Sequence, residues 1–203
     1  MRNAYLLTGG PGVGKTTIIK QALDNALRTK YRSPQGGQAG AGGFFTEEIR
    51  AGGVRQGFRI VTLDGQSAIL AHVDTKGPYR VSKYGVDVEG LDRVGVAALR
   101  QAIRECDLVV IDEIGKMELF SHAFTEAVLE AINSNKRVLG TIMLPSHPWA
   151  DQIKRHPNVI TITVTRMNHR QVLGQVLDWL KSPTEEGVSL QALQKRLKIG
   201  KTG

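Results

Sequence analysis

Nine residues near the N-terminus have the composition and spacing of a phosphate-binding loop. The segment GGPGVGKTT at 9–17 follows a short apolar run at 5–7 and precedes an amphipathic helical pattern. A strand, the pattern GxxxxGK[ST] and then a helix form the Walker A context. Its glycines let the backbone turn tightly, so that successive N–H groups and the helix N-terminus form one anion site. The segment therefore predicts binding of a nucleoside di- or triphosphate. The predicted binding residues are Gly9, Gly10, Pro11, Gly12, Val13, Gly14, Lys15, Thr16 and Thr17.

Two side chains of this loop have predicted roles in the chemistry. The ammonium group of Lys15 is expected to reach the β- and γ-phosphates, and the Thr16 hydroxyl is expected to ligate Mg²⁺. A glycine-rich turn with a stray lysine is the alternative interpretation, and the matching elements on both sides disfavour it.

The segment LVVIDEIGK at 108–116 predicts the second half of the site. An apolar strand that ends in an aspartate is the Walker B pattern, which makes Asp112 a metal ligand and nucleotide-binding residue. Glu113 follows directly, and a carboxylate at this place can deprotonate a water molecule beside the γ-phosphate. The alternative is a strand terminus with two solvated acids. We expect Glu113 and Lys15 to be catalytic, and Thr16 and Asp112 to hold Mg²⁺.

Several further charged residues are weaker candidates. Lys116 is either a phosphate contact or a surface lysine. Glu118 either supports the site from behind or, as the favoured interpretation, is a charge at the start of a helix. For the remaining candidate cations a solvated surface is favoured; they are Arg50, Arg55, Arg59 and Lys83. The five histidines show no metal-ligand spacing.

Composition limits the class of protein. A chain of 203 residues suggests one domain, or one domain plus a small appendage, and 41% hydrophobic residues are enough for an ordinary globular core. No apolar run approaches the ~18 residues of a membrane helix. Cys106 is the only cysteine, which excludes an intrachain disulfide and fits a cytoplasmic location. The net charge of +8 permits nucleic-acid binding, but we favour solubility and attraction of phosphate as its cause.

Alternating strand and helix patterns predict an α/β fold with a mostly parallel sheet. Strands are expected at 1–8, 44–50, 107–111, 136–143 and 159–164, and helices at 13–30, 91–105, 121–133 and 168–181. An antiparallel hairpin is expected within 58–73, with another short strand at 81–89. A mobile loop, either a lid or a linker, is expected at 31–43, and a last short helix after Pro183. The predicted domain covers 1–181 with an insert at about 44–88, and the basic tail covers 182–203.

Several longer segments resemble the cancer-related nucleoside-triphosphatase family, small P-loop enzymes first described from thermophiles. Beside the phosphate loop, the matching segments are GFFTEEIR at 43–50, RQGFRIVTLDG at 55–65, VSKYGVDVEGL at 81–91, VVIDEIGKMELF at 109–120, LGTI at 139–142 and VTRMNHR at 164–170. The resemblance implies a RecA-like core and Mg²⁺-dependent hydrolysis of ATP, GTP, CTP and UTP. The chain departs from the family at Ser82, where glycine is usual, at His169, where arginine is frequent, and in the longer link at 31–42.

A nucleoside-triphosphatase is therefore the predicted function, and two alternatives stay open. A nucleoside or nucleotide kinase shares the loop and the two acids but needs a second pocket for an acceptor. A nucleic-acid-stimulated ATPase is suggested by the basic charge. Neither a membrane partner nor an oligomeric state is indicated by the sequence.

Overall fold

A computed structural model describes residues 2–28 and 40–182. The predicted end of the first helix at 30, most of the glycine-rich segment at 31–43 and the tail after Pro183 lie outside these ranges. In chain order the described elements are β1 (Ala4–Thr8), α1 (Lys15–Arg28), β2 (Ala41–Ala51), β3 (Val54–Thr62), β4 (Ser67–His72), β5 (Arg80–Val81), β6 (Tyr84–Val86), α2 (Val88–Gly90), a π-helical turn (Leu91–Val96), α3 (Ala97–Glu105), β7 (Leu108–Ile114), a 3₁₀ turn (Glu118–Phe120), α4 (His122–Asn133), β8 (Arg137–Ile142), α5 (Pro148–Lys154), β9 (Val159–Thr163) and α6 (His169–Lys181).

The strands of the described residues form one sheet, in the order β5-β6-β4-β3-β2-β7-β8-β1-β9. The five strands from β2 to β9 in this order pair in parallel, and those from β5 to β2 pair antiparallel. This confirms the α/β fold with a parallel centre and added antiparallel strands. Because β1, β7 and β8 are parallel, the loops that follow them meet at one edge of the sheet.

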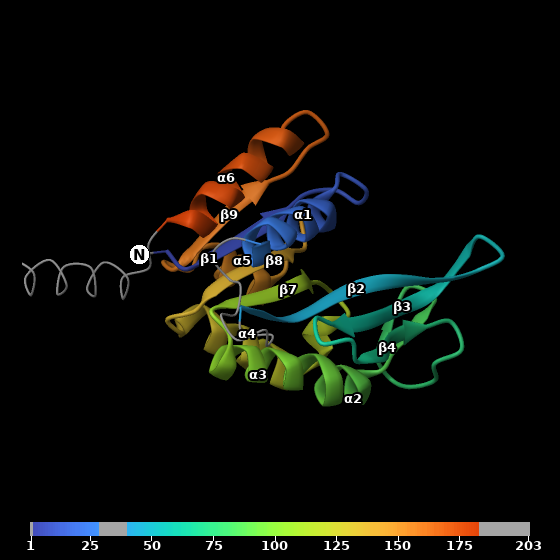
Figure 1. The fold of residues 1–203 in the computed structure, drawn as a ribbon. Coiled ribbons are helices and arrows are strands. Elements are labelled where there is room, and N and C mark those ends of the chain that lie inside the picture. The colour runs from blue at the N-terminus through green and yellow to red at the C-terminus, as the bar shows by residue number, and fades with distance from the viewer. Residues whose placement is uncertain (1, 29–39, 183–203) are drawn as a thin grey trace, which may run out of the picture.

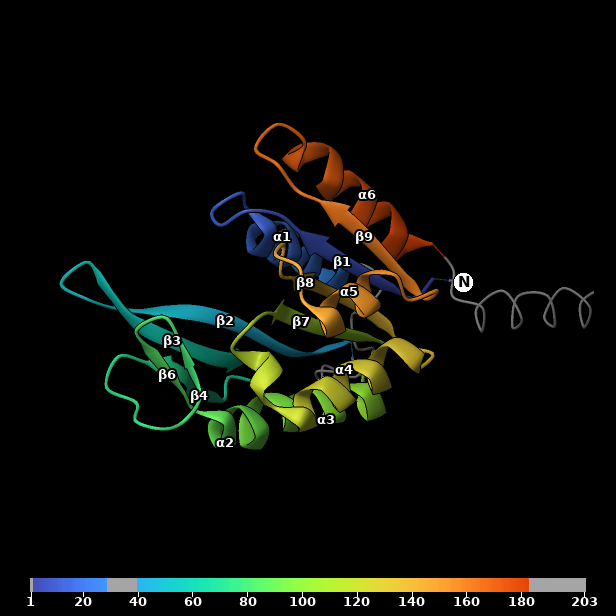
Figure 2. The same cartoon turned by 180° about the vertical axis from the view of Figure 1, so that it is seen from behind.

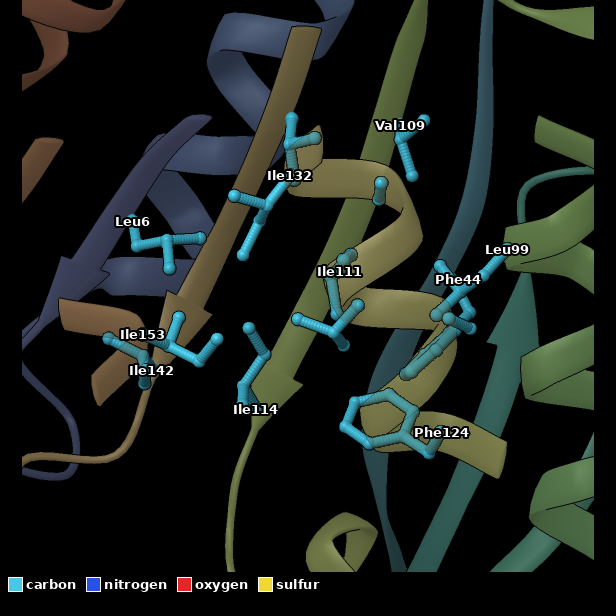
Figure 3. Close-up of a cluster of buried hydrophobic side chains, with 14 of the residues drawn as sticks. Leu6, Phe44, Leu99, Val109, Ile111, Ile114, Phe124, Ile132, Ile142 and Ile153 are labelled. Carbon is cyan, nitrogen blue, oxygen red and sulfur yellow. The ribbon is translucent and has the colours of Figure 1, made fainter. Parts of the chain in front are cut away.

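Helices cover both faces of the parallel part. Figures 1 and 2 show α1 and α6 on one face, and α3 and α4 on the other. Successive residues of a strand point to opposite faces, so Leu6 packs with α4, whereas Leu7 packs with α1. In Figure 3, Phe44 of β2, Ile111 of β7 and Phe124 of α4 gather in the larger of the two clusters. The central parallel strands β1, β7 and β8 are therefore buried on both sides, as their apolar sequences predict.

Most elements agree with the sequence patterns, and the differences have local causes. The predicted loop up to Gly43 ends earlier, because residues 41–43 pair with Leu108–Val110 of β7. The sequence pattern did not predict α5, a helix of seven residues that begins with Pro148. Phe120 shares the helical spacing of the α4 core, but it is 37% exposed and stacks with Tyr79, since α4 begins only at His122. No helix in the described ranges combines the length and apolarity needed to span a membrane.

Ser82 occupies a position that favours glycine. It is the first residue of a two-residue turn between β5 and β6, where Val81 pairs with Tyr84. Its φ of 54° lies in the left-handed region, and it is the one non-glycine residue with positive φ in the described part of the chain. A hairpin turn with positive φ at its first central residue normally has glycine there. The departure from the family pattern at this position therefore places serine in a strained conformation.

Replacing Ser82 with glycine is expected to stabilise the protein. The change removes the steric cost of a side chain at positive φ, about 1–2 kcal/mol, and adds the smaller entropic cost of glycine. We expect a net gain of about 0.5–1 kcal/mol in the free energy of unfolding, measured by denaturant titration. The matched control is Lys83→Gly in the same turn, which adds the entropic cost of glycine, removes the lysine from the Tyr84 ring and should destabilise. Equal losses in both variants would contradict this account of the turn.

Candidate active site

The phosphate loop connects β1 to α1, as the sequence predicts. Helix α1 begins at Lys15, and its first hydrogen bonds include Ile18 N–H to the carbonyl oxygen of Gly14 at 3.0 Å. The backbone N–H groups before this point are thus available to an anion at the helix N-terminus. The Lys15 ammonium donates to the carbonyl oxygens of Gly9 at 2.9 Å and Gly10 at 3.0 Å. These bonds hold a positive charge beside the loop.

Asp112 lies at the carboxyl end of β7 and is 3% exposed. The Thr141 hydroxyl of β8 donates to its Oδ1 at 2.5 Å, and the Thr16 hydroxyl of the phosphate loop is a second donor. Burial raises the pKa of the Asp112 carboxyl above its usual value, and these hydrogen bonds and the Lys15 charge act in the opposite direction. The structure therefore connects the two sequence motifs through Thr16 and Asp112.

Glu113 points into the same region from the next position of β7. The pairing register between β7 and β8 is interrupted between Ile111 and Ile114, where the two acids lie. Burial raises the pKa of Glu113, the Asp112 charge raises it further, and the charge of Lys15 opposes both. An acid with a raised pKa is a stronger proton acceptor when ionised than an exposed carboxylate.

A cavity of about 740 Å³ joins the loop and the two acids. All predicted nucleotide-binding residues line it except Val13, whose side chain packs in the core beside Gly9. The cavity continues past Glu113 onto the antiparallel strands. The further lining residues are Thr46, Glu48, Arg55, Phe58, Leu70, Val81, Lys116, Met117, Glu118, Met143, Leu144 and Pro145.

A family model described as NTPase matches residues 4–177 of this chain. The chain belongs to the NTPase family. Nucleoside-triphosphatase THEP1 of Thermotoga sp. (strain RQ2) is 44% identical over 176 residues, which cover 87% of this chain and 94% of that protein. Nucleoside-triphosphatase THEP1 of Methanocaldococcus jannaschii is 38% identical over 178 residues, covering 86% and 98%.

Two solved structures share the fold of this NTPase. The crystal structure of THEP1 from the hyperthermophile Aquifex aeolicus has a TM-score of 0.75 at 34% identity, and it covers 88% of this chain and 99% of that one. The solution structure of a human cancer-related nucleoside triphosphatase has a TM-score of 0.72 at 35% identity, covering 89% and 98%. The resemblance inferred from the sequence motifs is thereby confirmed.

Only one of the four candidate cations on the antiparallel strands lines the cavity of this NTPase. Arg55 does so while its Nε lies 2.9 Å from Glu48 Oε1. Arg50 also pairs with Glu48, and Arg59 pairs with Glu47. Lys83 is exposed and lies over the Tyr84 ring. The favoured surface interpretation therefore fits Arg50, Arg59 and Lys83, and Arg55 differs by its place at the cavity.

Glu118 stands at the start of a short helix, as the favoured interpretation predicts, but it also lies at the site, which that interpretation did not predict. The helix is a 3₁₀ turn, and Glu118 is only 3% exposed and lines the cavity. Its Oε2 accepts a hydrogen bond from Gly115 N–H at 3.1 Å. Burial, reinforced by the nearby charge of Glu113, raises the pKa of Glu118 to about 8. The sequence could not show this, because the turn that buries the side chain has no periodic pattern.

Sequence reasoning also missed Thr141 and the place of His169. A threonine near the end of the apolar strand LGTI was the available signal for Thr141. The His169 ring lies against Gly14, where an added Cβ would be 2.7 Å from its Cδ2. Gly14 also has a φ of 94°, so both its conformation and its neighbour require glycine. His169 therefore contacts the phosphate loop although it replaces the arginine that is frequent in the family.

The oxygen atoms of Thr16 and Asp112 are suitable ligands for a magnesium ion. Thr16 and Asp112 supply oxygen atoms only, and Mg²⁺ prefers oxygen ligands completed by phosphates and water. Within the described residues there is no cluster of three or more histidine, cysteine or acidic side chains arranged for a metal. Such a small protein donor set is typical of a cation that is held together with a nucleotide rather than by a protein cage.

The buried Glu118 predicts a specific dependence of stability on pH. Its pKa rises from 4.5 to about 8 on folding, so the folded state binds the proton more tightly. Stability from this group is therefore present at low pH and lost as the pH rises between these values, by at most about 1.4 kcal/mol per pH unit. Glu118→Gln has no carboxyl group to ionise and does not lose this stability. The free energy of unfolding of the variant, relative to that of the parent, should therefore increase from pH 5 to pH 8.

Denaturant unfolding at several pH values measures this difference. The matched control is Glu89→Gln, an exposed position at the start of α2, for which the difference should stay near zero. A pH-independent difference for Glu118→Gln would show that Glu118 is ionised in the folded protein.

Proposed function

We propose that this chain hydrolyses nucleoside 5′-triphosphates to diphosphates and inorganic phosphate, with Mg²⁺ as cofactor. The observation that carries the proposal is the position of Glu113. A partly buried carboxylate with a raised pKa lines the same cavity as the Lys15 ammonium and the phosphate loop. The printed names of the relatives, nucleoside-triphosphatase, support the same reaction.

The reaction uses groups that the fold holds in place. Loop N–H groups and Lys15 bind the β- and γ-phosphates, and Thr16 and Asp112 hold the cation. When bound, Mg²⁺ supplies positive charge to the phosphate oxygens. Glu113 accepts a proton from a water molecule whose oxygen bonds to the γ-phosphorus, while the bond from this phosphorus to the β,γ-bridging oxygen breaks. Lys15 and the loop N–H groups stabilise the negative charge that develops.

Broad base specificity is part of this proposal. The groups assigned to the reaction act on phosphate, metal and water, which ATP, GTP, CTP and UTP share. Discrimination among bases requires hydrogen-bonding groups placed against the base edges, and the proposed machinery includes none. We therefore infer similar turnover numbers for these four substrates. A cytoplasmic location accords with this substrate range and with the single cysteine.

Two substitutions separate binding from turnover. Lys15→Ala should abolish triphosphate binding, because the loop loses its only charged contact to the β- and γ-phosphates among the assigned groups. Glu113→Gln should bind triphosphate like the parent and lose turnover by about 100-fold or more, since the amide cannot accept the proton. Calorimetry of Mg²⁺-nucleotide binding and a phosphate-release assay measure the two effects. Hydrolysis by Glu113→Gln at the parental rate would show that another group is the base.

Phosphoryl transfer to an acceptor molecule is a second candidate function. One observation favours it: the cavity also reaches the apolar side chains of Phe58, Leu70 and Val81 on the antiparallel strands. Glu113 would then take the proton from an acceptor hydroxyl in place of water. The Thr46 hydroxyl also lines the cavity, is buried and has no hydrogen-bond partner within residues 2–28 and 40–182, so a polar group is available there.

Release of free phosphate in the absence of acceptors distinguishes the two functions. With γ-³²P-labelled ATP and Mg²⁺ alone, we expect steady release of phosphate at the rate measured with added nucleosides and nucleoside monophosphates. Label in one of these acceptors would favour the second function. Val81→Trp then serves as the control, because the larger side chain fills the cavity beside the antiparallel strands and should stop transfer while release continues.

A further inference from the structure

The segment that follows β7 forms a turn, and the side chain that closes this turn has no role in the reaction described above. Gly115 N–H donates to Glu118 Oε2 at 3.1 Å, and Leu119 N–H donates to the Gly115 carbonyl oxygen at 3.2 Å. Gly115 is only two residues after Glu113. Glu118 therefore closes the turn that begins at the end of β7, the strand that carries Glu113.

The carboxyl groups of Glu113 and Glu118 converge on this glycine. A Cβ atom added at Gly115 would be 2.8 Å from Glu113 Oε1 and 2.9 Å from Glu118 Oε2. Both side chains line the cavity, yet only Glu118 is almost completely buried. Glycine at this position leaves the space in which the two carboxyl groups approach each other.

We propose that Glu118 is a positioning residue: as a neutral carboxylic acid it accepts the Gly115 N–H on one oxygen and directs its own O–H toward the Glu113 carboxylate. This bond fixes the orientation of Glu113 toward the attacking water. The inference rests on the proposed hydrolysis, in which Glu113 accepts the proton. Glu118 itself contacts neither the nucleotide nor the water.

The electrostatic surroundings support a neutral Glu118. The charged side chains with the largest effect on the pKa of Glu118 are Glu113 and Asp112, both negative and both on β7. Burial raises the pKa of Glu118 to about 8, so the acid keeps its proton at neutral pH. Above this pH, two carboxylates face each other across Gly115, the hydrogen bond is lost, and repulsion turns Glu113 away from the water.

The pH dependence of turnover tests this role. The parent protein, saturated with Mg²⁺ and ATP, should lose kcat as the pH rises above neutral, because Glu118 then loses its proton. In Glu118→Gln the amide accepts from Gly115 and donates toward Glu113 at every pH. Its kcat should be reduced only a few-fold at pH 7 and should stay level above pH 8. An alkaline decline that persists unchanged in Glu118→Gln, or a parent profile without that decline, overturns the proposal.

A second variant separates positioning from a purely structural role. Glu118→Ala should lower kcat at pH 7 by about 10- to 100-fold, the cost of misplacing a catalytic group by about 1 Å. Its KM and its affinity for Mg²⁺-ATP should match the parent, and Glu118→Gln should restore most of the rate. Parental kcat in Glu118→Ala contradicts the inference. If Glu118→Ala fails to fold, as judged by circular dichroism, the profile of Glu118→Gln alone decides.

The controls also separate this inference from the proposed function. Glu89→Gln changes an exposed acid far along the chain from the turn and should keep the parental profile. If the parent releases no phosphate, hydrolysis itself is wrong. If the parent hydrolyses ATP, Glu113→Gln does not, and both Glu118 variants behave like the parent, only the positioning role of Glu118 is wrong.

Discussion

The structure depends on the burial of negative charge at the carboxyl end of β7. Asp112, Glu113 and Glu118 lie in one low-dielectric region, and burial raises the pKa of each. The charge of Lys15 acts in the opposite direction on the pKa of Asp112 and Glu113. Isolated buried carboxylates are costly, so each needs a hydrogen bond, a cation or a proton. Asp112 has two hydroxyl donors, and Glu118 has a backbone donor and a pKa that favours its neutral form. The three acids thus differ in role because their surroundings differ.

Strand order provides these different surroundings. β8 lies between β1 and β7 in the sheet. Thr141 therefore reaches Asp112 from the neighbouring strand β8, and the phosphate loop, which follows β1, reaches it from beyond β8. The antiparallel strands supply the opposite wall of the cavity, which carries apolar side chains and the Arg55–Glu48 ion pair. A site assembled from several strands of one sheet is rigid, which favours electrostatic preorganisation.

The sequence was sufficient for the elements with strong local signals. The phosphate loop, the buried strand before Asp112 and the long amphipathic helices each follow from spacing, and the structure has them. The helix start at Glu118 was predicted, but its burial was not, because burial depends on a non-periodic turn and on packing between distant elements. Thr141 and His169 reach the site across strand and loop contacts that spacing along the chain does not encode. The short helix α5 was missed because seven residues give too little periodicity to recognise.

Strand β2 also limits how the chain length can vary. Residues 41–45 pair with β7, and residues 44–51 pair with β3, so Phe44 and Phe45 belong to both ladders. Phe44 packs in one core cluster and Phe45 against the other. An insertion of one residue in this overlap would exchange their faces and misalign both ladders at once. The irregular pairing after Ile49 and the exposed Gly52–Gly53 turn carry no such double constraint. We therefore expect this strand to tolerate insertions and deletions only at its distal end, where the register beside the catalytic acids is not disturbed.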